Sequence, residues 1–303
     1  MKIAKMEPVL EELEERYEDP SFSQSYEVFP DRAYENAKKG LDSIIFVDGK
    51  RRSFVRLMTT NGYVGVFSEV SAAAVLWSRK MGTKPLFSPR VPPKVVKVVG
   101  FSRDYPEEGE EEKVADLTFK VVKTGRDAME SVDNELKALE AEVVRERLRD
   151  GVLVVRDGPA IPDHVFEPGV GPIGLIKNVM LFGLPRDQLE ELSRLRKGER
   201  WDKIYCERKG KLKRVGTYLK LIDEEGLRGI VKVESFVDED WKIEELSKLF
   251  NELAVTLPSL TADLPIPRLP EDIFPIQFLE QQLSHFLTDR NYMITKILAF
   301  HRR

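Results

Sequence analysis

Two short runs decide the fold of this chain: IIFVDG at residues 44–49 and VLVVRDGP at residues 152–159. Each is apolar and rich in β-branched residues, which is typical of a central strand. Each ends at an aspartate followed by glycine, Asp48-Gly49 in the first and Asp157-Gly158 in the second. Because glycine permits a sharp exit, we expect each aspartate at a strand end, facing open space. Two such aspartates on neighbouring strands could hold a divalent metal ion between them.

The segments around these runs predict a mixed α/β sheet, because several strands come before the first long helix. Asn61-Gly62 is a strong hairpin signal. Apolar residues at helical spacing predict a long helix over 126–149, directly before the second Asp-Gly strand. Further strands are expected at 51–59, 63–71, 94–101, 116–124, 173–178, 216–222 and 229–234. Further helices are expected at 7–18, 32–39, 186–196, 241–253 and 276–286. The acidic run at 107–113 is expected to be a solvated loop, and the proline-rich stretch at 257–275 to be extended. We expect one domain over 1–303, with helices within 1–40 and 276–303 as extensions.

The composition narrows the class of protein. Hydrophobic residues make up 42% of the 303 residues and charged residues 33%, which predicts a sizeable core under a charged surface. The net charge of −4 gives no overall basic signature, so nucleic-acid binding would need local basic patches. A single cysteine, Cys206, excludes internal disulfides and cysteine-cluster zinc sites, and fits a reducing cytosol. With no long apolar run, we expect a cytoplasmic protein, and the Lys, Glu and Arg content favours a thermophile.

A metal site needs more ligands than two aspartates, and both aspartates could also be ordinary turn residues. The helix over 126–149 is the natural source of a third carboxylate, because it leads directly into the Asp157 strand. Glu135 lies beside its apolar stripe and is the preferred candidate, followed by Glu130 and Glu142. Lys177 closes an apolar strand. It either reaches solvent or supplies a point charge suited to a scissile phosphate.

Basic residues directly follow the first aspartate, at Lys50, Arg51 and Arg52. A basic edge beside carboxylates is what a nucleic-acid substrate requires, since phosphate contacts dominate affinity. Ordinary surface charge is the competing interpretation. The sequence contains no phosphate-binding glycine loop, no G-x-S-x-G and no H-x-x-x-H motif, and its histidines stand in no motif.

Six segments in order resemble the NurA family of nucleases, in a divergent branch, from about residue 43 to residue 287. They are FVDG, RDGPA, IGLIKN, the strand pair TYLKL and GIVKVES, and the late PRLPEDIFPIQFLEQQLSHFL. Their order and spacing carry the resemblance. It implies an RNase H-like mixed β-sheet flanked by helices, with irregular insertions, and a Mn²⁺- or Mg²⁺-dependent DNA nuclease. The family forms dimers and works with the hexameric ATPase HerA in DNA end resection for double-strand break repair.

The resemblance also assigns residues. Asp48 and Asp157 match the metal-binding aspartates of the family, and a glutamate is expected on the intervening helix, where Glu135 lies. Gln282 stands where the family has a late histidine, so His285 or Asp272 is expected to replace that ligand. We therefore expect catalysis by Asp48, Glu135, Asp157 and Lys177, with DNA bound by Lys50, Arg51 and Arg52. The alternative is a catalytically inactive NurA-like scaffold that binds DNA or the ATPase.

Overall fold

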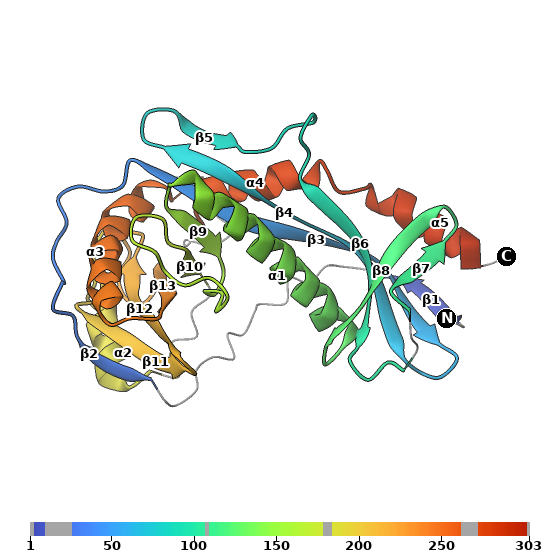
Figure 1. Cartoon of the computed structure of the whole chain (residues 1–303), viewed down its shortest axis with the longest axis horizontal. Coiled ribbons are helices and arrows are strands. Elements are labelled where there is room, and N and C mark those ends of the chain that lie inside the picture. Colours follow the sequence, from blue (N-terminus) through green and yellow to red (C-terminus); the bar gives the residue numbers. More distant parts are fainter. Residues whose placement is uncertain (1–2, 10–25, 107–108, 178–183, 262–271, 302–303) are drawn as a thin grey trace.

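The computed structural model describes residues 3–9, 26–106, 109–177, 184–261 and 272–301. One 13-stranded sheet runs through the molecule in the order β2-β11-β12-β13-β10-β9-β3-β4-β6-β8-β7, with β1 paired to β3 and β5 to β4 (Figure 1). Three pairs are parallel, β3–β9, β9–β10 and β6–β8. The expected mixed sheet flanked by helices is therefore confirmed.

The bounds of the strands and helices are as follows. The strands are β1 (Ile3–Pro8), β2 (Glu27–Pro30), β3 (Ser43–Thr59), β4 (Val64–Ser78), β5 (Gly82–Pro85), β6 (Lys94–Ser102), β7 (Glu111–Val114), β8 (Leu117–Gly125), β9 (Val154–Asp157), β10 (Ile173–Ile176), β11 (Lys203–Lys209), β12 (Leu212–Lys220) and β13 (Ile230–Val237). The helices are α1 (Ala128–Arg147), α2 (Arg186–Ser193), α3 (Trp241–Thr256), α4 (Phe274–Ser284) and α5 (Arg290–His301), with short 3-10 turns at Leu148–Asp150 and Leu257–Ser259.

The long hairpin of β3 and β4 forms the centre of the sheet. Its turn contains Gly62 at φ +84°, which confirms the Asn61-Gly62 signal. The strand expected from the run at 44–49 and the strand expected at 51–59 are one continuous strand, so the expected strand end at Asp48 is wrong. The physical reason is the partner strand: Asp48 pairs with Ala73 and Gly49 with Ala72, so the ladder continues through the Asp-Gly step.

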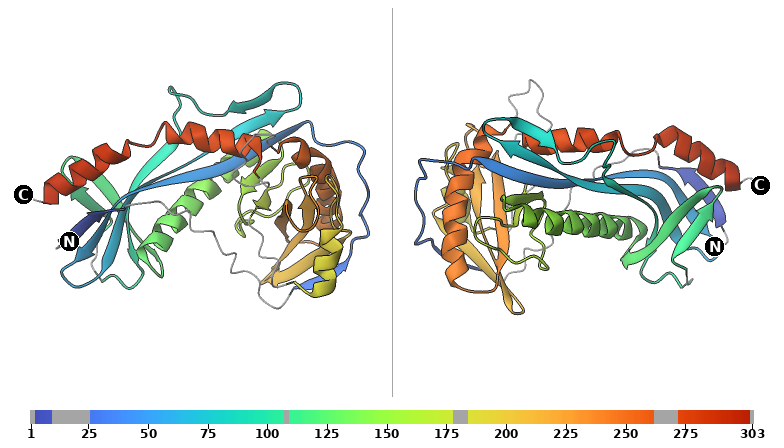
Figure 2. Two further views of the ribbon diagram at one scale, coloured as in Figure 1. Left: turned by 180° about the vertical axis from the view of Figure 1, so that it is seen from behind. Right: turned by 45° about the horizontal axis from the view of Figure 1, so that its top comes forward.

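Helices cover both faces of this hairpin (Figure 2). Helix α1 lies on one face, where Val132 and Leu139 pack against Val70 and Val98 of the sheet. Helix α4 lies on the other face and contacts β3 and β4. Its Leu279 shares a core cluster with residues of β3, β10 and α3. The two helices therefore reach different sets of strand side chains.

Both ends of the chain depart from expectation. Residues 3–8 form β1, which pairs with β3, so the helix expected at 7–18 does not begin there, and 10–25 lie outside the described residues. Residues 32–39 are irregular rather than helical, and Asp31 just before them is bound by the buried Arg200. The C-terminal region contains two helices, α4 and α5, where one was expected.

The remaining differences concern smaller elements. The acidic run expected as a loop contains β7, and its first two residues lie outside the described part. Strand β11, which pairs with β2 and β12, was not expected. In the part of the chain that the structure describes, no helix is both long and apolar enough to cross a membrane. The single-domain expectation stays a prediction.

Candidate metal centre

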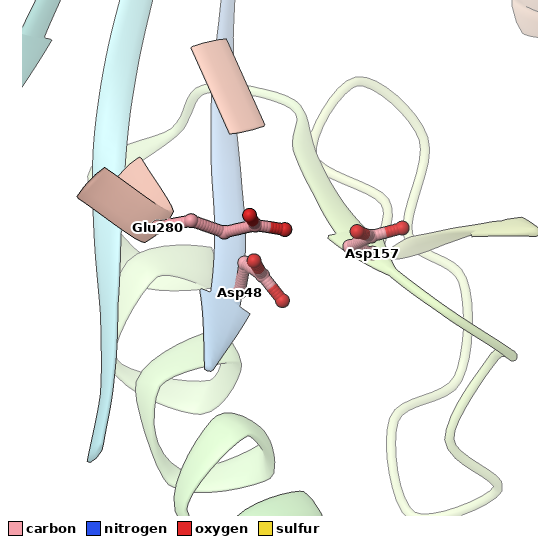
Figure 3. A group of neighbouring side chains, drawn as sticks. All are labelled: Asp48, Asp157 and Glu280. Atoms are coloured by element: carbon pink, nitrogen blue, oxygen red, sulfur yellow. The ribbon is translucent and has the colours of Figure 1, made fainter. Parts of the chain in front are cut away.

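Three carboxylates from distant parts of the sequence meet beside the central strands. Asp48, Asp157 and Glu280 each offer an oxygen, and these oxygens all lie within 4.8 Å of one another. Figure 3 shows Asp48 on β3, Glu280 extending from α4 across β3, and Asp157 at the end of β9. Carboxylate oxygens at this spacing are the ligands that hard divalent cations such as Mn²⁺ and Mg²⁺ prefer.

Strand alternation places the two aspartates on the same face. Successive side chains of a strand point to opposite faces, so Asp48 shares the face of Phe46, and Asp157 that of Val155. Both Phe46 and Val155 belong to the core cluster that includes α4. Val47 pairs with Arg156 in the parallel β3–β9 ladder, which brings the two aspartates to the same level.

The turn after Asp157 is held in place from the opposite face. Gly158 adopts φ +107°, and its N–H donates to Leu175 O at 2.7 Å. The carbonyl of Pro159 accepts from the buried Arg156, and the N–H of Ala160 donates to a carboxylate oxygen of Glu234 at 3.1 Å. The expected strand end with a sharp exit is therefore confirmed for Asp157, in contrast to Asp48.

Glu280 reaches the site because of its position on α4. The buried residues Ile276, Leu279 and Leu283 fix the face of the helix that packs on the core. Residue 280 lies one turn after Ile276, on the flank of this buried face, so its side chain extends toward the sheet beside Asp48. Sequence reasoning missed this glutamate, although its spacing from the apolar residues of α4 was available as a signal.

The carboxylates raise one another's pKa values. Burial, and then the charges of Asp157, Glu280 and Glu140, raise the pKa of Asp48 well above its usual value. Burial likewise raises the pKa of Glu280. Asp48 is 8% exposed, and no described residue donates a hydrogen bond to the carboxylate of Asp48 or Glu280. An unpaired carboxylate as buried as that of Asp48 is costly, so this donor set fits a divalent cation.

Lys177 supplies the positive charge closest to the carboxylates. Its ammonium lies 2.7 Å from an oxygen of Asp157 and 3.7 Å from one of Asp272, which in turn accepts from Gln277 at 2.9 Å. Burial disfavours the charged form, but Asp157 and Asp48 outweigh it and raise the pKa of Lys177 above its usual value. The lysine therefore stays charged at neutral pH.

The glutamates expected from α1 lie elsewhere. Helix α1 covers the face opposite to Asp48, so Glu135 is not among the clustered carboxylates and instead binds Lys120 at 2.6 Å. Glu130 binds Arg126 and Glu142 binds Lys94. The buried glutamate of α1 is Glu140, whose partner is Arg156. The structure does not bring Glu135 to the other carboxylates. Helical periodicity could not show this, because it does not reveal which face of the sheet a helix covers.

The basic residues after Asp48 divide between the two faces. Arg51 points to α1 and pairs with Asp133, whereas Arg52 donates to the carbonyls of Leu287 and Thr288 after α4. Lys50 shares the face of Asp48, and its ammonium lies 3.5 Å from the backbone carbonyl of Glu280. The DNA-binding role of these three residues stays a prediction.

The two candidates for a late ligand, His285 and Asp272, lie at opposite ends of α4. His285 is the C-cap of this helix and is not in the carboxylate group. Asp272 precedes the helix and reaches the site through Lys177. The acidic residue that α4 itself brings to the two aspartates is Glu280.

Comparisons with known proteins find similarity at the level of the fold. No family model matches the sequence, and no curated protein matches it. Among solved structures, the fold is similar to the crystal structure of the NurA nuclease from Sulfolobus solfataricus, with a TM-score of 0.43, 12% sequence identity, and coverage of 87% of this chain and 88% of that one. Similarity at this level does not transfer residue roles, which rest on the geometry above.

Proposed function

We propose that this protein is a metal-dependent phosphodiester hydrolase acting on DNA. The observation that carries the proposal is the meeting of Asp48, Asp157 and Glu280, two of them without a hydrogen-bond donor among the described residues. A divalent ion held by carboxylates lowers the pKa of a bound water and stabilises the charge that develops on a phosphodiester. The order of sequence motifs that resembles the NurA family supports DNA as the substrate.

The residues present have distinct roles in this proposal. Asp48, Asp157 and Glu280 hold Mn²⁺ or Mg²⁺. Lys177, fixed between two aspartates, contacts the scissile phosphate as a point charge. Lys50, on the same face of β3 as Asp48, contacts the neighbouring backbone phosphate. Arg51 and Arg52 support the site by tying β3 to α1 and to the end of α4.

The cellular setting is also part of the proposal. The motif resemblance supports a cytosolic homodimer that acts with a HerA-type ATPase in DNA end resection. The single cysteine fits such a location. The competing proposal is an inactive scaffold, suggested by Gln282 in place of a late histidine. Glu280 weakens that argument, because a carboxylate two residues earlier completes a set of three oxygen ligands.

The test measures Mn²⁺-dependent cleavage of linear duplex DNA, single-stranded DNA and RNA by the purified chain. We expect Asp48→Ala, Asp157→Ala and Glu280→Ala each to reduce cleavage of DNA by about 100-fold or more, as loss of a group at a metal site does. Glu135→Ala is the matched control and retains full activity, since Glu135 pairs with Lys120 on the opposite face.

Two outcomes would contradict the proposal. Cleavage at the wild-type rate by all three carboxylate variants would exclude the triad as the catalytic site. A wild-type chain that binds DNA but neither cleaves it nor binds Mn²⁺ in calorimetry would instead establish the scaffold.

A further inference from the structure

The contacts of Lys177 indicate how many metal ions the centre can hold. Asp157 belongs to two groups at once: the triad with Asp48 and Glu280, and a pair with Asp272 around the ammonium of Lys177. In sites with two metal ions about 3.5–4 Å apart, a carboxylate commonly bridges the two cations. Here Asp157 has the position of such a bridge, with Lys177 on one side of it.

We propose that the centre takes one divalent ion, held by Asp48, Asp157 and Glu280, and that the ammonium of Lys177 replaces the second ion of a two-metal site. This inference rests on the proposed function, because it concerns the same carboxylates. Lys177 contacts Asp157 at 2.7 Å and Asp272 at 3.7 Å, so both carboxylates that could hold a second ion already bind a cation.

The charges of the site agree with a single ion. Four carboxylates lie in or beside it: Asp48, Asp157, Asp272 and Glu280. One divalent ion together with the ammonium groups of Lys177 and Lys50 matches their charge. A second divalent ion would bring excess positive charge next to Lys177, whose side chain is only 14% exposed and is poorly screened by water.

The position of Lys177 is fixed by its surroundings. It directly follows β10, which is parallel to β9, so it leaves the sheet at the same edge as Asp157. Asp272, its second contact, is held by Gln277 of α4 at 2.9 Å. Elements β9, β10 and α4 thus define one location for the ammonium.

The number of Mn²⁺ ions is measured directly on the full chain, by calorimetric titration and by electron paramagnetic resonance. We expect one bound Mn²⁺, with the six-line spectrum of an isolated ion. Two ions with an exchange-coupled spectrum would overturn the inference and leave the proposed function intact. No bound ion would overturn both, so the two failures are distinguishable.

A substitution tests the role of the lysine itself. Lys177→Met removes the ammonium and keeps the length of the side chain, and we expect a second Mn²⁺ to bind between Asp157 and Asp272. If Lys177 merely held Asp157 in position, the variant would bind one ion, with lower affinity, and the inference would fail. Lys94→Met, which removes a positive charge from an exposed pair with Glu142, is the control and binds one ion. The wild-type ion count stands as evidence even if Lys177→Met does not fold.

Discussion

Buried carboxylates lie on both faces of the central sheet, but their surroundings differ. On the α1 face, Glu140 is paired with Arg156, and Glu234 accepts from the hydroxyl of Tyr205 at 2.6 Å and lies 3.1 Å from Lys232. On the α4 face, the buried Asp48 and the half-buried Glu280 have no such partner among the described residues. A buried charge is tolerated when it is paired, which holds for Glu140 and Glu234 and also for Glu69 on the α4 face, where Thr288 and Lys97 contact it. The unpaired carboxylates are therefore confined, among the described residues, to the proposed metal centre.

The two faces are nevertheless connected. Arg156 and Asp157 are adjacent on β9, so the arginine points to α1 while the aspartate points to α4. Arg156 and Glu234 both bind the turn that follows Asp157. The paired charges on one face therefore support the backbone that presents Asp157, the partner of Lys177, on the other.

The largest expected effect on stability comes from removing the Arg156–Glu140 ion pair on the α1 face. Arg156→Met leaves Glu140 buried without its partner, which costs about 3–5 kcal/mol in the free energy of unfolding. Urea denaturation measures this loss. The double variant Arg156→Met with Glu140→Leu removes both charges and should recover most of it. A single variant that loses less than about 1 kcal/mol would show that the pair is not what stabilises this face.

The next effect belongs to the carboxylate triad on the α4 face. A ligand that binds only the folded state stabilises it, by about 2.7 kcal/mol at a concentration 100 times its Kd. We therefore expect Mn²⁺ to raise the melting temperature of the wild-type chain and a chelator to reverse the rise. Asp157→Asn should abolish the effect, whereas Glu135→Gln should retain it. Equal stabilisation of both variants would place the bound metal outside the triad.

The sequence predicted much of the architecture around this site. The Asn61-Gly62 hairpin, the long helix α1 and the strand that ends at Asp157 follow from local patterns, because turn chemistry and periodicity are local properties. The continuation of β3 past Asp48 was not predicted from these patterns. Its Asp-Gly step has the composition of a strand end, but pairing with Ala72 and Ala73 of β4 keeps it extended.

Which helix supplies the third carboxylate of the triad depends on a property that no local pattern contains. The periodicity of α1 identified a helix that packs on the sheet, yet gave no information on which face it covers. Alternation along β3 shows that Asp48 and Gly49 point in opposite directions, and α1 lies over Gly49, whose added Cβ would meet Leu136 and Glu140. Only the arrangement of helices in space shows that α4, through Glu280, brings the third carboxylate to Asp48 and Asp157.

The smallest expected effect is a gain in stability when the carboxylate of Asp48 is removed. Its raised pKa means that the folded state disfavours the charged form, so the metal-free protein loses stability as pH rises above about 4. We expect Asp48→Asn to raise the stability of the metal-free chain at pH 7 by about 1 kcal/mol, which corresponds to a melting temperature higher by about 2–4 °C. The difference should vanish below about pH 3, where the wild-type carboxylate is protonated in both the folded and the unfolded state. Thermal melting in chelator across this pH range makes the comparison. A variant less stable than the wild type at pH 7 would mean that Asp48 is a paired, structural carboxylate like Glu140.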